Sequence, residues 1–180
     1  YAMSLEELRE QNIRLVTEKA LECFIKNGIS NTRVSEIAAE SGLTQRSVFR
    51  YFPSKDDIVI AAAFCYWERT KAYIARELRR HTDDAQTGIE QINIILNSYA
   101  NMLFVDPEGI RFSLDAEVAL YSVGKNAHVI NRPPERYEAY KGPLSQAVRR
   151  GLADGTVDPN ANIKQLYYNA YDSILGMMQR

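Results

Sequence analysis

The stretch that decides the fold is residues 32–55, Thr32-Arg-Val-Ser-Glu-Ile-Ala-Ala-Glu-Ser-Gly-Leu-Thr-Gln-Arg-Ser-Val-Phe-Arg-Tyr-Phe-Pro-Ser-Lys55. Its first apolar residues recur at the spacing of one helical face: Val34, Ile37 and Ala38. We expect Thr32 to cap this helix, because a threonine hydroxyl can accept from an otherwise unpaired backbone N–H. Gly42 follows the apolar face, and glycine takes the positive φ that such a helix end requires. The pattern predicts a short helix that ends in a tight turn.

A second short helix is expected over residues 45–51, with Thr44 as its cap. If Val48 points inward, Arg46 and Arg50 lie on the opposite face, because successive helical residues turn by about 100°. The two short helices, joined at a glycine turn, form a helix-turn-helix. This motif places its second helix in the major groove of DNA.

The polar residues of the second helix suit distinct contacts with DNA. Arg46 and Gln45 could reach base edges, since arginine pairs with guanine and glutamine with adenine. Phosphate contacts, which fix register without reading sequence, are expected from Thr44, Arg50, Tyr51 and Lys55. A solvated helix face is the alternative interpretation of Arg46 and Arg50. From Lys26 to Lys55 there are five cations and two anions, a net charge of +3, so we expect an affinity that depends on salt.

Residues 13–63 resemble the DNA-binding domain of the TetR (AcrR-like) family of bacterial transcriptional regulators. The resemblance rests on four segments: Ala20…Phe24…Gly28, Thr32-x-Val34-x-Glu36-Ile37-Ala38, Ser41-Gly42-Leu43-Thr44 and Val48-Phe49-Arg50-Tyr51-Phe52-Pro53-Ser54-Lys55-Asp56-Asp57. Two positions depart from the family pattern, because Arg46 stands where glycine is frequent and Phe49 where tyrosine is frequent. The operator of a relative is therefore not transferable. The residues expected at DNA are Thr32, Arg33, Ser35, Thr44, Gln45, Arg46, Ser47, Phe49, Arg50, Tyr51 and Lys55.

The rest of the chain also has helical patterns, which predict an all-α fold with an N-terminal three-helix head and a C-terminal helical bundle. Further helices are expected over residues 5–27, 55–81, 89–105, 107–122, 134–153 and 160–180, with a loop at 124–134. Ser54 and Asp106 are expected caps. We expect a DNA-binding helix-turn-helix domain over residues 1–54 and a ligand-binding and dimerisation domain over residues 55–180.

The resemblance implies that the C-terminal bundle serves dimerisation and binding of a small-molecule effector. A stripe on the last helix is the candidate dimer interface, unless it packs into its own core: Leu166, Tyr167, Ala170, Ile174 and Met178. Candidates to line an effector pocket, where ordinary core is the alternative, are Phe64, Trp67, Tyr99, Met102, Phe112, Glu117 and Tyr121. Glu117 could face a cationic ligand or be a solvated or paired carboxylate. In the resembled family one more helix usually follows the last one expected here.

Composition restricts other functions. The chain has 180 residues, 46% of them apolar, which is enough for a packed core. Its net charge of −1 is not that of a general nucleic-acid binder, so the positive charge must be local. Two distant cysteines, Cys23 and Cys65, predict no disulfide framework and fit a cytoplasmic protein. We read no signal peptide, membrane span, catalytic motif, metal site or cofactor site in the sequence.

The sequence therefore predicts a ligand-responsive, DNA-binding transcriptional regulator. We expect a homodimeric repressor that a small-molecule effector releases from a near-palindromic operator, with half-sites about 34–36 Å or a multiple of this apart. The alternative is a helical ligand-binding module or an enzyme with a purely structural head.

Overall fold

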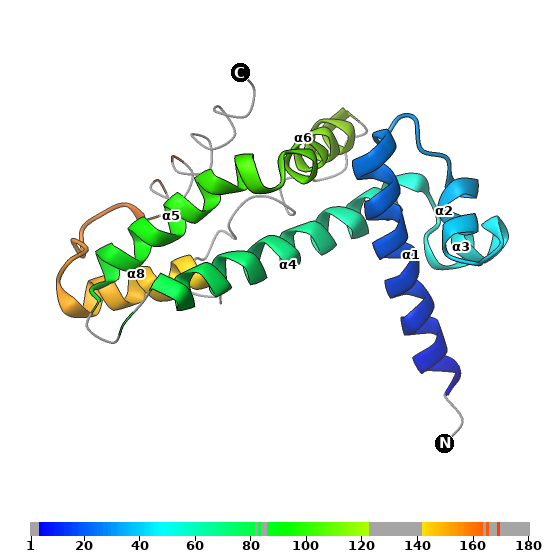
Figure 1. Ribbon diagram of the computed structural model, residues 1–180. Helices are drawn as coiled ribbons and strands as arrows, with labels where there is room; N and C mark the ends of the chain where they lie inside the picture. Colours follow the sequence, from blue (N-terminus) through cyan, green and yellow to red (C-terminus); the bar gives the residue numbers. More distant parts are fainter. Residues whose placement is uncertain are drawn as a thin grey trace. The chain divides into compact units, whose positions relative to one another are not determined.

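The structure is a computed structural model that describes residues 4–81, 83, 86–122, 142–163, 165 and 169, without the side chains of residues 121 and 122. Every element in these residues is a helix, and the predicted all-α class is confirmed (Figure 1). The helices are α1 (Leu5–Asn27), α2 (Val34–Glu40), α3 (Gln45–Tyr51), α4 (Lys55–His81), α5 (Gly88–Val105), α6 (Pro107–Ser122) and α8 (Pro143–Asp154).

The chain divides into two compact units. The first consists of Tyr1–Trp67 and Arg111–Ile130, and the second of Glu68–Ile110 and Asn131–Arg180. The division runs through α4 and α6, whereas the sequence placed a functional boundary after residue 54. The first turns of α4 therefore pack with α1–α3 as part of one unit.

The first unit has a core to which each of its helices contributes. Side chains with no more than 2% of their surface exposed come from α1, α2, α3, α4 and α6: Leu21, Phe24, Ile37, Val48, Ile58, Phe112 and Leu120. The ring of Phe112 lies parallel to that of Phe24, with centroids 5.9 Å apart, and meets the ring of Tyr66 edge-on at 6.2 Å. The α6 segment thus closes the core between α1 and α4. Burial raises the pKa of the Cys23 thiol, which is also part of this core.

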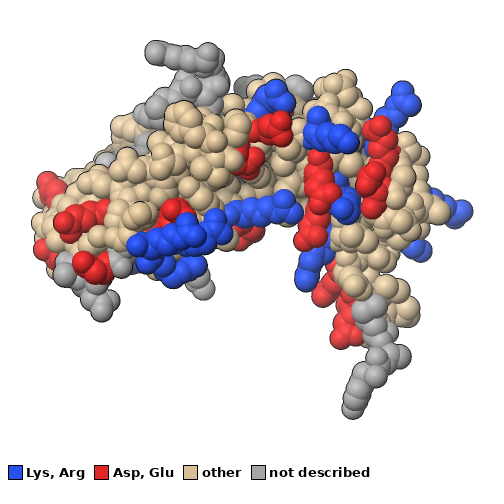
Figure 2. All heavy atoms as spheres, viewed as in Figure 1, with Lys and Arg blue, Asp and Glu red and all other residues tan. Residues whose placement is uncertain are grey.

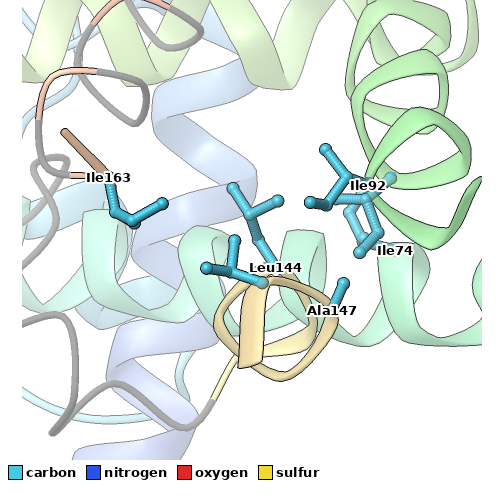
Figure 3. Packing of buried hydrophobic residues seen from close by; sticks show 7 residues of the cluster. Ile74, Ile92, Leu144, Ala147 and Ile163 are labelled. Atoms are coloured by element: carbon cyan, nitrogen blue, oxygen red, sulfur yellow. The ribbon is translucent and has the colours of Figure 1, made fainter. Parts of the chain in front are cut away.

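The second unit is built on α5 and α8. Ile74 of α4, apolar side chains of α5 and α8, and Ile163 belong to one buried cluster (Figure 3). Gly88 and Gly151 allow α5 and α8 to approach closely. A Cβ added at Gly88 would overlap the backbone N and Cα of Gly151 and lie 2.7 Å from the carbonyl oxygen of Ala147. The absence of a side chain at Gly88 is therefore a packing requirement.

The predicted helix over residues 134–153 is interrupted at Gly142. Instead of one helix over residues 134–153, α8 begins at Pro143, preceded by Gly142 with an extended ψ of 168°. Proline suits the first helical position because its missing N–H would have no partner there. The segments 123–141 and 170–180 lie outside the described residues, and with them the predicted loop and most of the last predicted helix. No helix in the described part of the chain is long and apolar enough to cross a membrane.

Candidate nucleic-acid interface

The loop before α2 differs from the expectation. Arg33, and not Thr32, is the N-cap residue of α2, and its backbone N–H donates to the Glu36 carboxylate at 2.7 Å. Only 1% of the Thr32 surface is exposed. The Thr32 hydroxyl is directed to the carbonyl oxygens of Gly28 at 2.8 Å and Cys23 at 3.2 Å. The prediction that the Thr32 side chain contacts DNA is therefore wrong, because that side chain ties the loop to the end of α1.

The turn between α2 and α3 forms as predicted. Gly42 has a φ of +65°, a conformation that residues with a Cβ rarely adopt. The backbone N–H of Leu43 returns to the carbonyl oxygen of Ala38 at 2.9 Å, and that of Gly42 to Ala39 at 3.0 Å. These bonds satisfy carbonyl groups at the end of α2 and fix the direction in which α3 leaves.

α3 is held to the head by one apolar face. Val48 is fully buried and Phe52, just after the helix, is 7% exposed. Thr44 caps the helix as predicted, accepting from the backbone N–H of Ser47 at 3.1 Å. The Thr44 hydroxyl also donates its hydrogen to the Ser47 hydroxyl at 3.0 Å, so this hydrogen already takes part in a bond within the N-terminal three-helix head.

The opposite face of α3 is exposed and basic. Gln45, Arg46 and Arg50 are exposed, as are Arg33 and Ser35 at the start of α2. Lysine and arginine side chains project from the surface around α2 and α3 (Figure 2). Long donors on a short helix that is packed on one side can enter a groove without any change in the core. The geometry therefore suits the insertion of α3 into the major groove of DNA.

Tyr51 is fixed by a residue far away in the sequence. The side-chain amide of Asn12, on α1, donates to the Tyr51 hydroxyl oxygen at 3.1 Å. Because that oxygen accepts, its own hydrogen is left to donate outward. The guanidinium of Arg50 lies 5.6 Å from the centre of the Tyr51 ring. These contacts orient a hydroxyl and a cation side by side, an arrangement that suits a phosphate.

Lys55 begins α4 and also holds the α1–α2 loop. Its ammonium donates to the carbonyl oxygen of Ile29 at 2.6 Å. An ammonium has three hydrogens, so this bond leaves capacity for a phosphate. The predicted Ser54 cap is confirmed, because Ser54 accepts from the Asp57 N–H at 3.2 Å while its own N–H donates to the Asp57 carboxylate at 3.0 Å.

The predicted effector residues differ in how far they are buried. Met102 and Phe112 are 4% and 2% exposed, and Phe112 packs against Phe24 in the core. Trp67, Tyr99 and Glu117 are half-buried and Phe64 is 41% exposed, while the side chain of Tyr121 is outside the described residues. An effector site stays a prediction. The predicted dimer residues Leu166, Tyr167, Ala170, Ile174 and Met178 are also outside the described residues.

The contact of Asn12 with Tyr51 could not be foreseen from the sequence. Asn12 lies 39 residues before Tyr51. It is half-buried, in a part of α1 that carries no recognisable motif. No periodicity or spacing links two such residues. Only the folded arrangement of α1, α2 and α3 brings them together.

The fold and this surface define a helix-turn-helix DNA-binding protein. The family model described as "Bacterial regulatory proteins, tetR family" matches residues 16–62, from α1 to the first turns of α4. Over these residues the chain is similar to the TetR family of bacterial transcriptional regulators.

Two relatives from Bacillus subtilis (strain 168) are similar to parts of the chain. The "Uncharacterized HTH-type transcriptional regulator YuxN" is 29% identical over 90 residues, which is 50% of this chain and only 30% of that protein. The "Fatty acid metabolism regulator protein" is 24% identical over 149 residues, or 83% of this chain and 72% of that protein.

The fold is also that of solved structures. A TetR-family transcriptional regulator from Cytophaga hutchinsonii superimposes with a TM-score of 0.66 at 16% identity. The superposition covers 99% of this chain and 86% of the other. At this identity the likeness concerns the fold alone.

Proposed function

We propose that the protein is a homodimeric repressor that binds a near-palindromic operator and is released by a small-molecule effector. The observation that supports this most is the exposed face of α3, where Arg46 and Arg50 stand free of the core beside the anchored Tyr51 hydroxyl. A two-fold dimer presents two such helices, which matches the symmetry of a palindrome. Such a partner also favours a cytoplasmic location.

The contacts divide by chemistry. Arg46 and Gln45 read base edges, because both can make paired hydrogen bonds in the major groove. Arg33, Arg50, Tyr51 and Lys55 bind phosphates and set the register of α3. Their positive charge is local in a chain of net charge −1, so the affinity falls as the salt concentration rises.

Release follows from a shift between two states of the dimer. An effector that binds one state better raises its population, and operator affinity falls if the spacing of the two α3 helices in that state does not match the half-sites. We propose that α4 transmits the change from the second unit to the first, since it is one continuous helix from Lys55 to His81 and contributes residues to both units. Because one relative is named as a fatty acid metabolism regulator, fatty acids are the first probes.

The DNA-binding part is tested by selecting bound duplexes from a random-sequence library with the purified protein. The R46A/R50A double variant is then compared with R69A/R79A, which removes two exposed arginines from the second half of α4. We expect R46A/R50A to lose at least about 100-fold in affinity, because each arginine contact is worth about 1–3 kcal/mol. R69A/R79A should remain within about threefold of the parent.

Three results would contradict the proposal. The first is a selection that enriches no sequence. The second is an equal loss in both variants, which would indicate only general charge attraction. The third is a fatty acid or other effector that binds the protein while operator affinity stays constant. This result would contradict release by an effector but not the binding of the operator.

A further inference from the structure

One side chain on the exposed face of α3 does not fit a polar surface. Among the residues of α2 and α3, all of which the structure describes, Phe49 is the only large apolar side chain that is exposed. Its exposed fraction is 40%, whereas Val48 is fully buried and Phe52 is 7% exposed. The inner face of α3 is therefore filled without the Phe49 ring. Exposure of a phenyl ring costs free energy in the unbound protein, so a contact in the complex would recover it.

The neighbours of Phe49 place the ring in the proposed reading surface. Gln45 is four residues before it and Arg46 three residues before it, so both lie next to it on the same side of the helix. Both are exposed. An apolar ring thus stands between two long polar side chains that suit adenine and guanine edges.

The chemistry of the ring limits what it can recognise. Phenylalanine has no hydrogen-bond donor or acceptor, so it cannot bind a phosphate or a base edge as a tyrosine hydroxyl would. In the major groove the one apolar group that a base presents is the 5-methyl group of thymine, and phenylalanine is among the side chains that contact it. Cytosine carries only a hydrogen at that position, so such a contact separates T·A from C·G.

We propose that Phe49 is a specificity-determining residue that contacts the 5-methyl group of one thymine in each half-site, beside the bases read by Gln45 and Arg46. This inference rests on the proposed function, because it requires α3 in the major groove. The contact removes the methyl group and part of the ring from water together. Its loss should weaken binding by about fourfold per half-site, the effect of exposing one methyl group.

The test uses duplexes selected from a random-sequence library, resynthesised with deoxyuridine in place of one thymidine at a time. This exchange removes the methyl group and keeps every hydrogen bond of the base pair. We expect one thymine per half-site at which deoxyuridine weakens binding of the parent protein about fourfold, and about 15-fold when both half-sites are changed. In F49A the same exchange should have no effect, whereas F49L should keep part of it.

Controls separate this contact from changes in folding or DNA shape. I89A removes an apolar side chain of similar exposure, 41%, from the start of α5, and it should respond to deoxyuridine as the parent protein does. Thymines outside the contact should be insensitive in all proteins. Circular dichroism shows whether F49A and F49L remain folded, and the experiment with the parent protein needs no variant at all.

Each other outcome overturns the inference. If no thymine is sensitive, or if the selected half-sites contain none, no methyl group is read. If deoxyuridine weakens the parent, F49A and F49L equally, another residue reads the methyl group. These results leave sequence-specific binding intact, whereas a selection that enriches no duplex overturns the proposed function as well.

Discussion

The helix-turn-helix and the α5–α8 pair are held together by contacts of different range. In the helix-turn-helix, the caps join residues three apart, such as Ser47 to Thr44 and Asp57 to Ser54. In the α5–α8 pair, the N–H of Gly88 donates to the Asp154 carboxylate at 2.7 Å, across 66 residues, and that of Ile89 to the Thr156 hydroxyl at 3.2 Å. The first region is therefore specified by local sequence, and the second by a close approach that only the folded chain creates.

The largest effect is expected from G88A. The added Cβ meets backbone atoms of α8 that cannot move without separating the two helices. We expect a loss of about 3 kcal/mol in the free energy of unfolding, measured by urea or thermal denaturation. G42A is the matched change in the helix-turn-helix: open space surrounds Gly42, and only its positive φ opposes a side chain. This variant should lose about 1–2 kcal/mol.

An equal loss in G88A and G42A would contradict the comparison. It would mean that the approach of α5 to α8 is loose enough to admit a methyl group. A larger loss in G42A would reverse the order and place the tightest constraint in the turn.

The helix-turn-helix also has long-range contacts, and the one between Asn12 and Tyr51 is tested by a smaller effect. Y51F removes the hydroxyl that Asn12 orients, and we expect a loss of about tenfold in affinity for a selected duplex. N12A should lose less, about threefold, because the hydroxyl remains and only its orientation relaxes. Both variants should keep the thermal stability of the parent within a few degrees.

A double-mutant cycle gives the decisive measurement. If Asn12 acts through Tyr51, N12A has no effect in the Y51F background. If N12A weakens binding equally in both backgrounds, Asn12 does not act as a positioning residue for Tyr51. A loss of stability in either variant would assign the contact to folding.

The difference in range explains what could be predicted from the sequence. The bounds of α1, α3, α4 and α6 match the expectation, and α5 begins one residue earlier, because apolar periodicity and caps act over a few residues. The exposed arginine face of α3 followed from placing Val48 inward. Its neighbour Tyr51 was also foreseen at phosphate, and that contact stays a prediction.

What the sequence did not reveal depends on distant partners. Thr32 looked like a cap, but two carbonyl groups at the end of α1 take its hydroxyl. For Phe112 the sequence left pocket and core open, and Phe24 of α1 stacks on its ring. The break at Gly142 was missed, because apolar periodicity does not show that this residue is extended. Each case concerns a residue whose environment is set by the tertiary fold.

The smallest expected effect concerns pH and compares Asp154 of the α5–α8 pair with Glu7, which makes a local cap contact at the start of α1. The hydroxyl of Thr156 and then the N–H of Gly88 lower the pKa of Asp154 by hydrogen bonding to its carboxylate. The backbone N–H and hydroxyl of Ser4 lower the pKa of Glu7 at the start of α1 in the same way. A carboxylate with a lowered pKa in the folded state stabilises the fold above its unfolded pKa of about 4, and this stability is lost as the pH falls through the folded value.

D154N and E7Q should therefore melt below the parent at pH 7 and approach it below about pH 4. The difference in melting temperature should be larger for D154N, because Asp154 joins the start of α5 to the end of α8, whereas Glu7 holds one exposed turn of α1. Melting curves from pH 3 to 7 measure both. If the melting temperature of D154N is lower than that of the parent by the same amount at every pH, the charge of the carboxylate has no part in the contact. If E7Q melts as far below the parent as D154N does, the sequence separation of the bonded residues makes no difference to the strength of the contact.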